Sequence, residues 1–298
     1  IAADSSGFGV WYEPGIGTPQ KRFGVRIFTD DEVVGEYVPP RSRATVLMSA
    51  GVALAHALLH KPALERERHY QTMRRLTKHV GEAGIGALDI ALWDLAGKCC
   101  GLSIAQMLGG HRWHLPAYAS TIHGDEQKGG LNHPEAYADF AESCLDLGYP
   151  GFKMHGWKAG DPKRESMMIR SVAERVGGKM EVMYDASCYL KTLTDAIRVG
   201  QVCDEYNLLW YEDPYADGGL SFSGHKLLKQ KVQTPIMIGE HVRTVETHTD
   251  LMSQVQQILV GLILTMMEAS PVATRLRLPP KRWELMWKCI LVDLQCAN

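Results

Sequence analysis

The chain has 298 residues, of which 45% are hydrophobic and 22% are charged, a globular balance that suggests one large domain or two modest ones. Its formal net charge of −2 gives no reason to expect a nucleic acid or an anionic membrane as a partner. The longest apolar run, residues 258–267, is about half as long as the ~20 residues of a membrane-spanning helix. The seven Cys residues are irregularly spaced and form no Cys-x-x-Cys pair, which favours a reducing, cytoplasmic compartment.

The first third of the chain, residues 1–112, predicts an α+β domain. Alternating apolar residues over residues 23–37 indicate a β-hairpin. A helical stretch is expected over residues 42–79, and another over residues 83–108, where apolar residues recur at helical spacing. Because the chain starts at Ile1 and not at Met, we expect that the start of this domain is missing.

From residue 113 onward, short apolar strands alternate with amphipathic helices. Strands are expected at residues 115–120, 151–155, 180–185, 208–212 and 236–240, with helices at residues 133–147, 163–176, 193–206 and 224–230. This alternation predicts parallel β–α–β units. The sequence has no dinucleotide-type glycine loop, so we favour a (β/α)8, TIM-like barrel over a doubly wound sheet. The predicted fold class is therefore α/β, with barrel strands one to five in residues 113–252.

Three acidic residues close three successive predicted strands: Asp185, Glu212 and Glu240. Their spacings, 212 − 185 = 27 and 240 − 212 = 28, correspond to one β–α unit each. In a parallel barrel these strand ends converge, and three carboxylates there would repel one another without a cation. Oxygen ligands favour Mg²⁺, with Mn²⁺ as the second choice. Each acid alone is equally consistent with a helix N-cap or a surface charge, but three in register favour a metal site.

The preceding strand carries Lys153 and His155, which point to the same face because they are two residues apart. Beside a metal site, a lysine is expected to have a lowered pKa and to act as a base or an electrostatic partner. Histidine already titrates in the useful range. The alternative is a surface lysine beside a capping histidine, which the three neighbouring acids disfavour. Lys153 and His155 are therefore the candidate catalytic residues.

At these residues the chain resembles the mandelate racemase and muconate-lactonizing group of the enolase superfamily. The segment GALDIALWDLAGKCCGLSIAQMLGG looks like the end of that group's capping domain. The Lys-x-His strand, followed by the Asp, Glu and Glu strand ends, looks like its barrel. The resemblance extends over residues 23–252 and implies an α+β capping domain in front of a TIM-like barrel.

The resemblance implies Mg²⁺ on Asp185, Glu212 and Glu240, bound also by the substrate carboxylate. The metal would stabilise the enediolate that forms when the proton α to the carboxylate is removed. Bases would come from the second strand and from a His on the seventh strand. The chain departs from the mandelate racemase pattern, which has Lys-x-Lys where Lys153-x-His155 stands here. His241, directly after the third acid, is a candidate for binding a polyhydroxy substrate, although a surface histidine is equally consistent.

By analogy, the resemblance favours a metal-dependent lyase of carbohydrate acid catabolism that dehydrates an acid sugar to a 2-keto-3-deoxy acid. A racemase or cycloisomerase of the same family is the alternative. A third possibility is an inactive remnant that has lost the seventh-strand His. We expect a small carboxylate or acid sugar as substrate, no nucleic acid or membrane partner, and a homo-oligomer for the full-length protein.

The end of the chain fits the barrel poorly. Three further β–α units would need roughly 84 residues (3 × 28), and 298 − 240 = 58 follow Glu240. In another reading frame, residues 257–270 and 280–296 can encode strings that resemble the family's sixth and seventh strands. We therefore expect residues 253–298 to be a frameshifted tail, natural or from a sequencing error, and the barrel to be incomplete at its C-terminal end.

Overall fold

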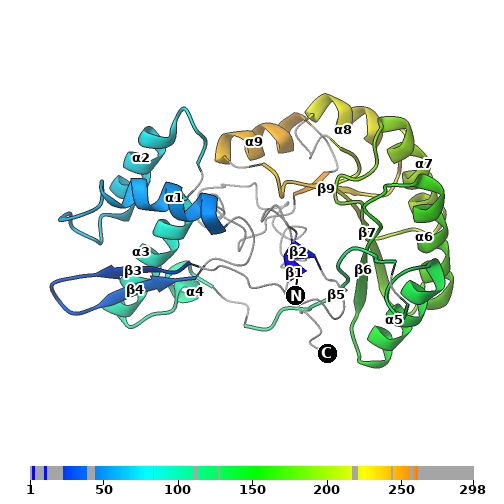
Figure 1. The fold of residues 1–298 in the computed structure, drawn as a ribbon, viewed down its shortest axis with the longest axis horizontal. Helices are drawn as coiled ribbons and strands as arrows, with labels where there is room; N and C mark the ends of the chain where they lie inside the picture. The colour runs from blue at the N-terminus through cyan, green and yellow to red at the C-terminus, as the bar shows by residue number, and fades with distance from the viewer. Residues whose placement is uncertain are drawn as a thin grey trace.

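The protein is described by a computed structural model, in which two parts lie side by side (Figure 1). The N-terminal part is drawn in blue and cyan, and the second part runs from green to orange. The described residues are 2–3, 10–11, 23–38, 44–82, 84–110, 113–126, 128–216, 221–242, 244–254 and 258–260.

The N-terminal domain is built on a hairpin covered by a helix. Strands β3 (Val25–Phe28) and β4 (Val34–Tyr37) pair antiparallel, as the alternating pattern predicted. Helix α3 (Ile85–Cys100) packs against both strands. Gly35 permits this approach, because a Cβ there would collide with the carbonyl oxygen of Ala91. Two further short strands, β1 (Ala2–Ala3) and β2 (Val10–Trp11), pair with each other.

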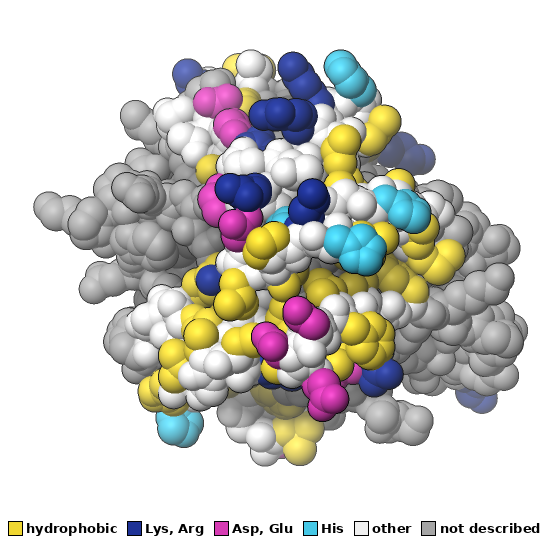
Figure 2. Space-filling model, turned by 90° about the vertical axis from the view of Figure 1, so that its left-hand side faces the viewer, with side chains coloured by type: hydrophobic (Ala, Val, Ile, Leu, Met, Phe, Trp, Pro, Cys, Tyr) yellow, Lys and Arg dark blue, Asp and Glu magenta, His cyan; other side chains and the backbone are white. Residues whose placement is uncertain are grey.

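The predicted helical stretch over residues 42–79 is two helices, α1 (Ala44–Ala55) and α2 (Arg66–Thr77). Pro62 lies between them, and proline both lacks the backbone N–H and disfavours a helical conformation in the residue before it. A short helix, α4 (Ile104–Met107), follows α3. The helices enclose a small hydrophobic core that consists of Leu54, Tyr70, Met73, Ile85 and Leu88. Figure 2 looks onto this domain, where hydrophobic side chains lie among charges of both signs.

The second part contains a parallel sheet whose strands follow one another in chain order. Its strands are β5 (Ala119–Ser120), β6 (Gly151–His155), β7 (Glu181–Asp185), β8 (Tyr211–Glu212), β9 (Ile236–Ile238) and β10 (Ile258–Val260). Each strand pairs in parallel with the next. Sequential parallel order is the arrangement expected of a barrel and not of a doubly wound sheet.

A helix follows each of the strands β5 to β9. These helices are α5 (Pro134–Asp146), α6 (Pro162–Val176), α7 (Leu193–Glu205), α8 (Phe222–Lys229) and α9 (Val245–Gln254). Side chains of residues just before α5 to α8 accept hydrogen bonds from the first turns, as N-caps do. Helices α5 to α8 cover the outer face of the sheet in Figure 1, and the shared core includes Phe152, Tyr184 and Tyr211.

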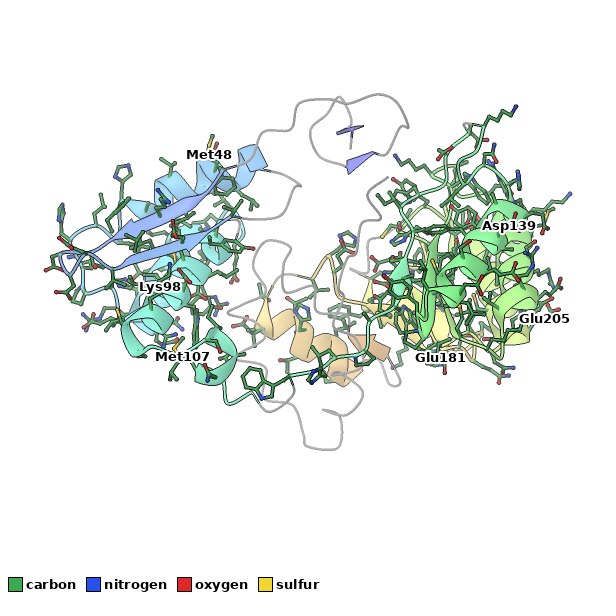
Figure 3. All side chains as sticks on the ribbon, turned by 90° about the horizontal axis from the view of Figure 1, so that it is seen from below. Met48, Lys98, Met107, Asp139, Glu181 and Glu205 are labelled. Atoms are coloured by element: carbon green, nitrogen blue, oxygen red, sulfur yellow. The ribbon has the colours of Figure 1, made fainter. Side chains whose placement is uncertain are left out.

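The two domains contact each other through Arg74 on α2 and Glu246 on α9. Nη2 of Arg74 lies 3.0 Å from both carboxylate oxygens of Glu246. Nε of Arg74 also donates to Glu82 at 2.8 Å, so one guanidinium joins the N-terminal domain to α9. Figure 3 shows α9 between the domain that carries Met48 and Lys98 and the one that carries Asp139 and Glu205.

The α/β class is confirmed, and the five strands expected in residues 113–252 are present as β5 to β9. Strand β10, at Ile258–Val260, lies within the segment that we predicted to be a tail. Most of that segment, residues 261–298, lies outside the described residues, as does the position of the seventh-strand His. The domain boundaries, the frameshift and the incomplete barrel stay predictions. No described helix has the length and apolar character of a membrane span.

Candidate active site

Three of the predicted site residues lie side by side at the carboxyl ends of neighbouring strands. His155 on β6 pairs in register with Asp185 on β7, and Asp185 pairs with Glu212 on β8. Glu212 pairs with Met237 of β9, and Glu240 follows three residues later in the turn after that strand. The one-unit spacing therefore places Asp185 and Glu212 on paired strand ends, whereas Glu240 lies beyond the end of β9.

Lys153 lies between two of these acids. Its Nζ donates hydrogen bonds of 2.9 Å to Oδ2 of Asp185 and of 2.9 Å to Oε2 of Glu212. Burial acts to lower the pKa of Lys153, but Asp185 and Glu212 outweigh burial and hold the pKa well above its usual value. The expected lowering of this pKa refers to a site that holds a cation, and it stays a prediction. Lys153 is a buried, charged ammonium.

His155 is more accessible than Lys153, with 19% of its side chain exposed against 3%. Its Nε2 lies 2.9 Å from Oδ2 of Asp185. Two hydrogen bonds fix its backbone, one from its N–H to Oγ1 of Thr121 at 2.8 Å and one from the Tyr137 hydroxyl to its carbonyl at 2.6 Å. An imidazole in this position can exchange a proton with a group above the strand ends.

Asp185 receives hydrogen bonds on both oxygens. Oδ2 faces Lys153 and His155, and Oδ1 accepts from the Ser187 N–H at 2.8 Å and from its hydroxyl at 3.1 Å. Burial acts to raise the pKa of Asp185, but Lys153 and His155 hold it well below its usual value. Asp185 is therefore an ionised buried carboxylate.

The negative charges of Glu212 and Glu240 are less well balanced by nearby positive groups than that of Asp185. Burial raises the pKa of Glu212 to about 7, although Lys153 opposes the shift and the Trp210 indole donates to Oε2 at 3.0 Å. Glu212 and Asp185 share the Lys153 ammonium, and Asp185 is also contacted by His155 and Ser187. Burial, aided by Asp213 and Asp185, also raises the pKa of Glu240.

These raised pKa values bear on whether a cation fits here. Four carboxylates, those of Asp185, Glu212, Asp213 and Glu240, influence one another electrostatically, and Lys153 is the buried lysine among them. A divalent cation would supply the positive charge that these groups lack, and carboxylate oxygens suit Mg²⁺. By their chemistry these donors suit the expected ion, but Asp185, Glu212 and Glu240 do not form a described group whose ligand atoms all lie within 4.8 Å of one another, so this ligand set stays a prediction.

His241, the candidate substrate-binding residue, lies beside Asp213. Its Nε2 is 3.2 Å from Oδ2 of Asp213, and 29% of its side chain is exposed. Burial raises the pKa of Asp213, although His241 opposes the shift. Sequence reasoning missed Asp213, because strand alternation points it away from the face of Glu212. The backbone of Asp213 has a φ of 38°, so its side chain does not take the direction that strand alternation predicts.

His123 was also missed. It lies in the segment after β5, with its ring centroid 5.6 Å from that of His155 and 5.1 Å from that of Tyr189, edge-on to both. Burial, followed by the charge of His155, lowers the pKa of His123 to about 4, so this imidazole is neutral. No spacing rule in the sequence could have placed it there.

Glu165 on α6 holds the loop that follows β6. Its carboxylate accepts from the Trp157 N–H at 2.9 Å and from the Tyr184 hydroxyl at 3.0 Å. A Cβ on Gly156 would collide with this carboxylate, so glycine is needed beside it. Burial raises the pKa of Glu165 to about 7. Glu165 thus fixes the backbone next to His155.

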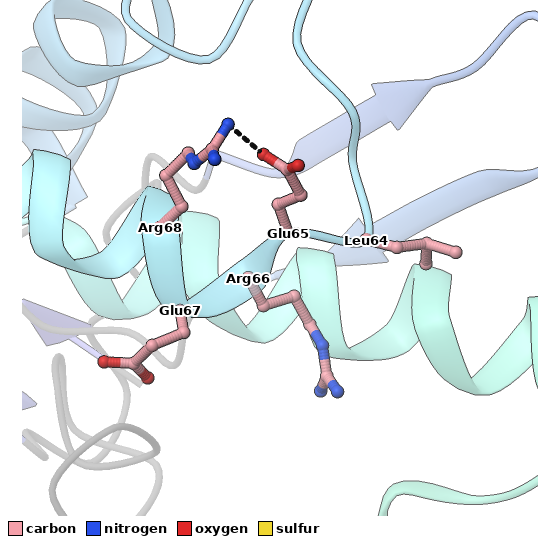
Figure 4. A pocket seen from close by; sticks show the side chains of 5 residues that line it. All are labelled: Leu64, Glu65, Arg66, Glu67 and Arg68. Carbon is pink, nitrogen blue, oxygen red and sulfur yellow. Dashed lines mark ion pairs between the residues drawn. The ribbon is translucent and has the colours of Figure 1, made fainter.

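A surface pocket of about 430 Å³ lies elsewhere, at the start of α2 in the N-terminal domain. Figure 4 shows the side chains that line it, Leu64, Glu65, Arg66, Glu67 and Arg68. Arg68 pairs with Glu65 at 2.7 Å. None of the predicted site residues lines this pocket.

Comparison with known families decides which group the chain belongs to. Residues 19–109 match the mandelate racemase / muconate lactonizing enzyme N-terminal domain, and residues 136–260 match the enolase C-terminal domain-like family. The chain belongs to the mandelate racemase and muconate-lactonizing family of the enolase superfamily. The predicted TIM-like barrel class is thereby confirmed.

Several relatives are named as sugar-acid dehydratases or cycloisomerases, and one is an N-succinyl-L-Arg/Lys racemase of Bacillus cereus. The chain is 27% identical over 229 residues to L-talarate/galactarate dehydratase of Salmonella typhimurium, covering 74% of this chain and 54% of that protein. It is 29% identical over 201 residues to D-galactarolactone cycloisomerase of Agrobacterium fabrum, covering 64% and 50%. The chain thus spans about half the length of these two relatives.

Among solved structures, the chain is similar to D-glucarate dehydratase from Agrobacterium tumefaciens complexed with magnesium. The TM-score is 0.75 at 27% identity, covering 85% of this chain and 67% of that one. The relatives thus include dehydratases and a cycloisomerase.

Proposed function

We propose that the protein is a metal-dependent lyase that removes the proton α to the carboxylate of an acid sugar and eliminates the β-hydroxyl. The observation that carries the proposal is the arrangement of Lys153 and His155 around Asp185, with Glu212 in the next strand. A base, a fixed positive charge and a row of carboxylate ligands are the parts that this proton abstraction needs. The dehydratases among the relatives support the same reaction class.

In this proposal Asp185, Glu212 and Glu240 hold Mg²⁺, with Mn²⁺ as the second choice. The chemistry that the ion supplies is stabilisation of negative charge on the substrate carboxylate during proton removal. Asp213, one residue after Glu212, stays outside this ligand set, since its Oδ2 faces His241.

The two cationic residues have different roles. His155 takes the α-proton on its imidazole, because it is the more exposed of the two and its backbone is held at both N–H and C=O. Lys153 is buried and donates hydrogen bonds to two carboxylates, so in this proposal it acts as a fixed positive charge and not as the base. His241, paired with Asp213, binds a hydroxyl of the substrate.

A cycloisomerase or racemase is the second candidate, because the first step is the same and D-galactarolactone cycloisomerase is among the relatives. The reactions differ only after the proton has been removed, in whether a hydroxyl leaves, a ring opens or a proton returns. We also propose that the full-length protein forms a homo-oligomer and is located in the cytoplasm.

The test is incubation of the full chain and Mg²⁺ with a panel of hexarates, hexonates and pentonates. A 2-keto product trapped with semicarbazide supports the lyase. A stereoisomer or ring-opened lactone, seen by NMR without a 2-keto signal, supports the alternative. Conversion that persists unchanged in EDTA would overturn the metal-dependent proposal.

A further inference from the structure

Beside the proposed magnesium ligands, Cys188, Asp213 and His241 converge. One ligand atom from each lies within 4.8 Å of the other two. They follow β7, β8 and β9 respectively, so the geometry that aligns the three strand ends also gathers this second group. None of the three is among Asp185, Glu212 and Glu240.

The backbone on which these side chains sit is unusual. Cys188 has a φ of 63° and Asp213 a φ of 38°, in the left-handed region that non-glycine residues seldom adopt. A hydrogen bond of 2.9 Å from the Cys188 N–H to the Asp213 carbonyl joins the two segments. Such conformations concentrate at binding and catalytic sites, where the surroundings hold them.

Asp213 supplies a second, independent observation. The residue is 2% exposed, and its Oδ1 accepts no hydrogen bond from the described part of the chain. A buried carboxylate oxygen without a donor is unfavourable and calls for a positive partner. Oδ2 faces Nε2 of His241 at 3.2 Å. Cys188 and His241 are partly exposed, so an ion can reach the group from solvent.

We propose that Cys188, Asp213 and His241 form a Zn²⁺ site. Thiolate sulfur, carboxylate oxygen and imidazole nitrogen are all donors that zinc binds, and three protein ligands leave its fourth position open. Tetrahedral zinc, with bonds of about 2.0–2.3 Å, spaces its ligand atoms roughly 3.5 Å apart. The ligand atoms of the three residues lie within 4.8 Å of one another, so binding would draw them closer together. On binding, the Cys188 thiol releases its proton to solvent.

The zinc site and the magnesium site select different ions. Oxygen-only ligands favour Mg²⁺, whereas thiolate and imidazole favour Zn²⁺. The charges also balance when both metal sites are filled. The carboxylates of Asp185, Glu212, Asp213 and Glu240 and the Cys188 thiolate carry −5 in total, which Lys153 and two divalent cations neutralise.

Zinc at this site would also affect the reaction. This effect rests on the proposed function, but the existence of the zinc site is independent of it. Zinc on His241 removes its imidazole from contact with a substrate hydroxyl. Zn²⁺ is therefore expected to inhibit an enzyme already saturated with Mg²⁺.

The test uses the full chain saturated with Mg²⁺ and titrated with Co²⁺, a spectroscopic probe for zinc sites. We expect a thiolate-to-cobalt charge-transfer band, abolished by Zn²⁺ and lost in Cys188→Ser. The band should persist in Cys99→Ser, which changes an exposed cysteine of the N-terminal domain. Asp213→Asn should weaken Co²⁺ binding at least about tenfold.

A second measurement uses only the wild-type chain, so misfolding of a variant cannot explain its result. In the wild-type chain with Mg²⁺, added Zn²⁺ should slow alkylation of Cys188 by iodoacetamide at least about tenfold and leave Cys99 unaffected, as peptide mass spectrometry reports. A cobalt band that survives in Cys188→Ser, or an unchanged alkylation rate for Cys188, would overturn the zinc site. Neither result depends on turnover, so both are separable from failure of the proposed function.

Discussion

Nε2 of His155 lies 2.9 Å from Oδ2 of Asp185, across the in-register pair that joins β6 to β7. The same oxygen accepts a hydrogen bond from Nζ of Lys153. An imidazole and an ammonium therefore meet on one carboxylate oxygen. Any cation bound by Asp185 acts directly on both neighbours, so base, charge and ligand form one electrostatic unit.

Replacing Glu212 with Gln should reduce turnover to an undetectable level and weaken Mn²⁺ binding at least about tenfold. The change removes a buried carboxylate that contacts Lys153 and lies next to Asp185. Electron paramagnetic resonance of Mn²⁺ gives the affinity, and the 2-keto assay gives the rate. Glu181→Gln is the matched control, because Glu181 is an exposed acid at the opposite end of β7. Wild-type metal affinity in Glu212→Gln would remove Glu212 from the ligand set.

His155→Ala and Lys153→Ala should each lower kcat at least about a hundredfold, the low end of general acid–base contributions. The first variant lacks the proton acceptor, and the second lacks the positive charge between Asp185 and Glu212. His79→Ala and Lys163→Ala, which change residues outside the site, should retain wild-type kinetics. Unchanged kcat in either active-site variant would exclude that residue from the mechanism.

Glu165 should make the free energy of unfolding depend on pH. Burial raises its pKa from 4.5 to about 7, so the folded chain holds a proton that the unfolded chain has released between these values. This contribution to stability is fully present below pH 4.5 and is lost as pH rises through 7, by roughly 3 kcal/mol in total.

Glu165→Gln keeps an acceptor for the Trp157 N–H and cannot titrate. In urea denaturation, the difference in unfolding free energy between Glu165→Gln and wild type should therefore move in favour of the variant from pH 5 to pH 8. The comparison cancels the titration of the other acids. A difference that is constant across this range would show that Glu165 is ionised throughout.

Arg74 and Glu246 should stabilise the contact between the two domains by a modest amount. The side chains are 29% and 62% exposed, so solvent screens the pair, and a coupling energy of about 0.5 kcal/mol is expected. A double-mutant cycle of Arg74→Ala and Glu246→Ala, measured by denaturation, gives this value. A coupling energy of zero would show that this pair does not stabilise the contact.

Much of the fold was readable from the sequence because its signals are local. Gly151–His155 is the predicted strand without any shift of its ends, and the one-unit spacing of Asp185 and Glu212 correctly anticipated neighbouring strand ends. The break between α1 and α2 was missed although Pro62 signals it, because the apolar pattern was read as continuous.

The rest of the site depends on backbone turns that spacing does not encode. His123 reaches His155 from a segment after β5, and Asp213 joins His241 because its backbone enters the left-handed region. Glu165 acts through the loop that follows β6, from one turn into α6. Period and spacing predict which face a strand residue occupies, but not where the residues beyond the strand end turn.

Exchange of the α-hydrogen tests the central claim most directly, because it reports proton removal regardless of the product that forms. Acid sugars are incubated in D₂O with the full chain, with Mg²⁺ or with EDTA, and deuterium at the α-carbon and in products is measured by NMR. The account predicts Mg²⁺-dependent loss of the α-hydrogen of at least one acid sugar in wild type and Glu181→Gln, and none in His155→Ala. Equal loss in EDTA, equal loss in His155→Ala, or no loss from any sugar acid by a chain shown to bind Mg²⁺ would contradict it.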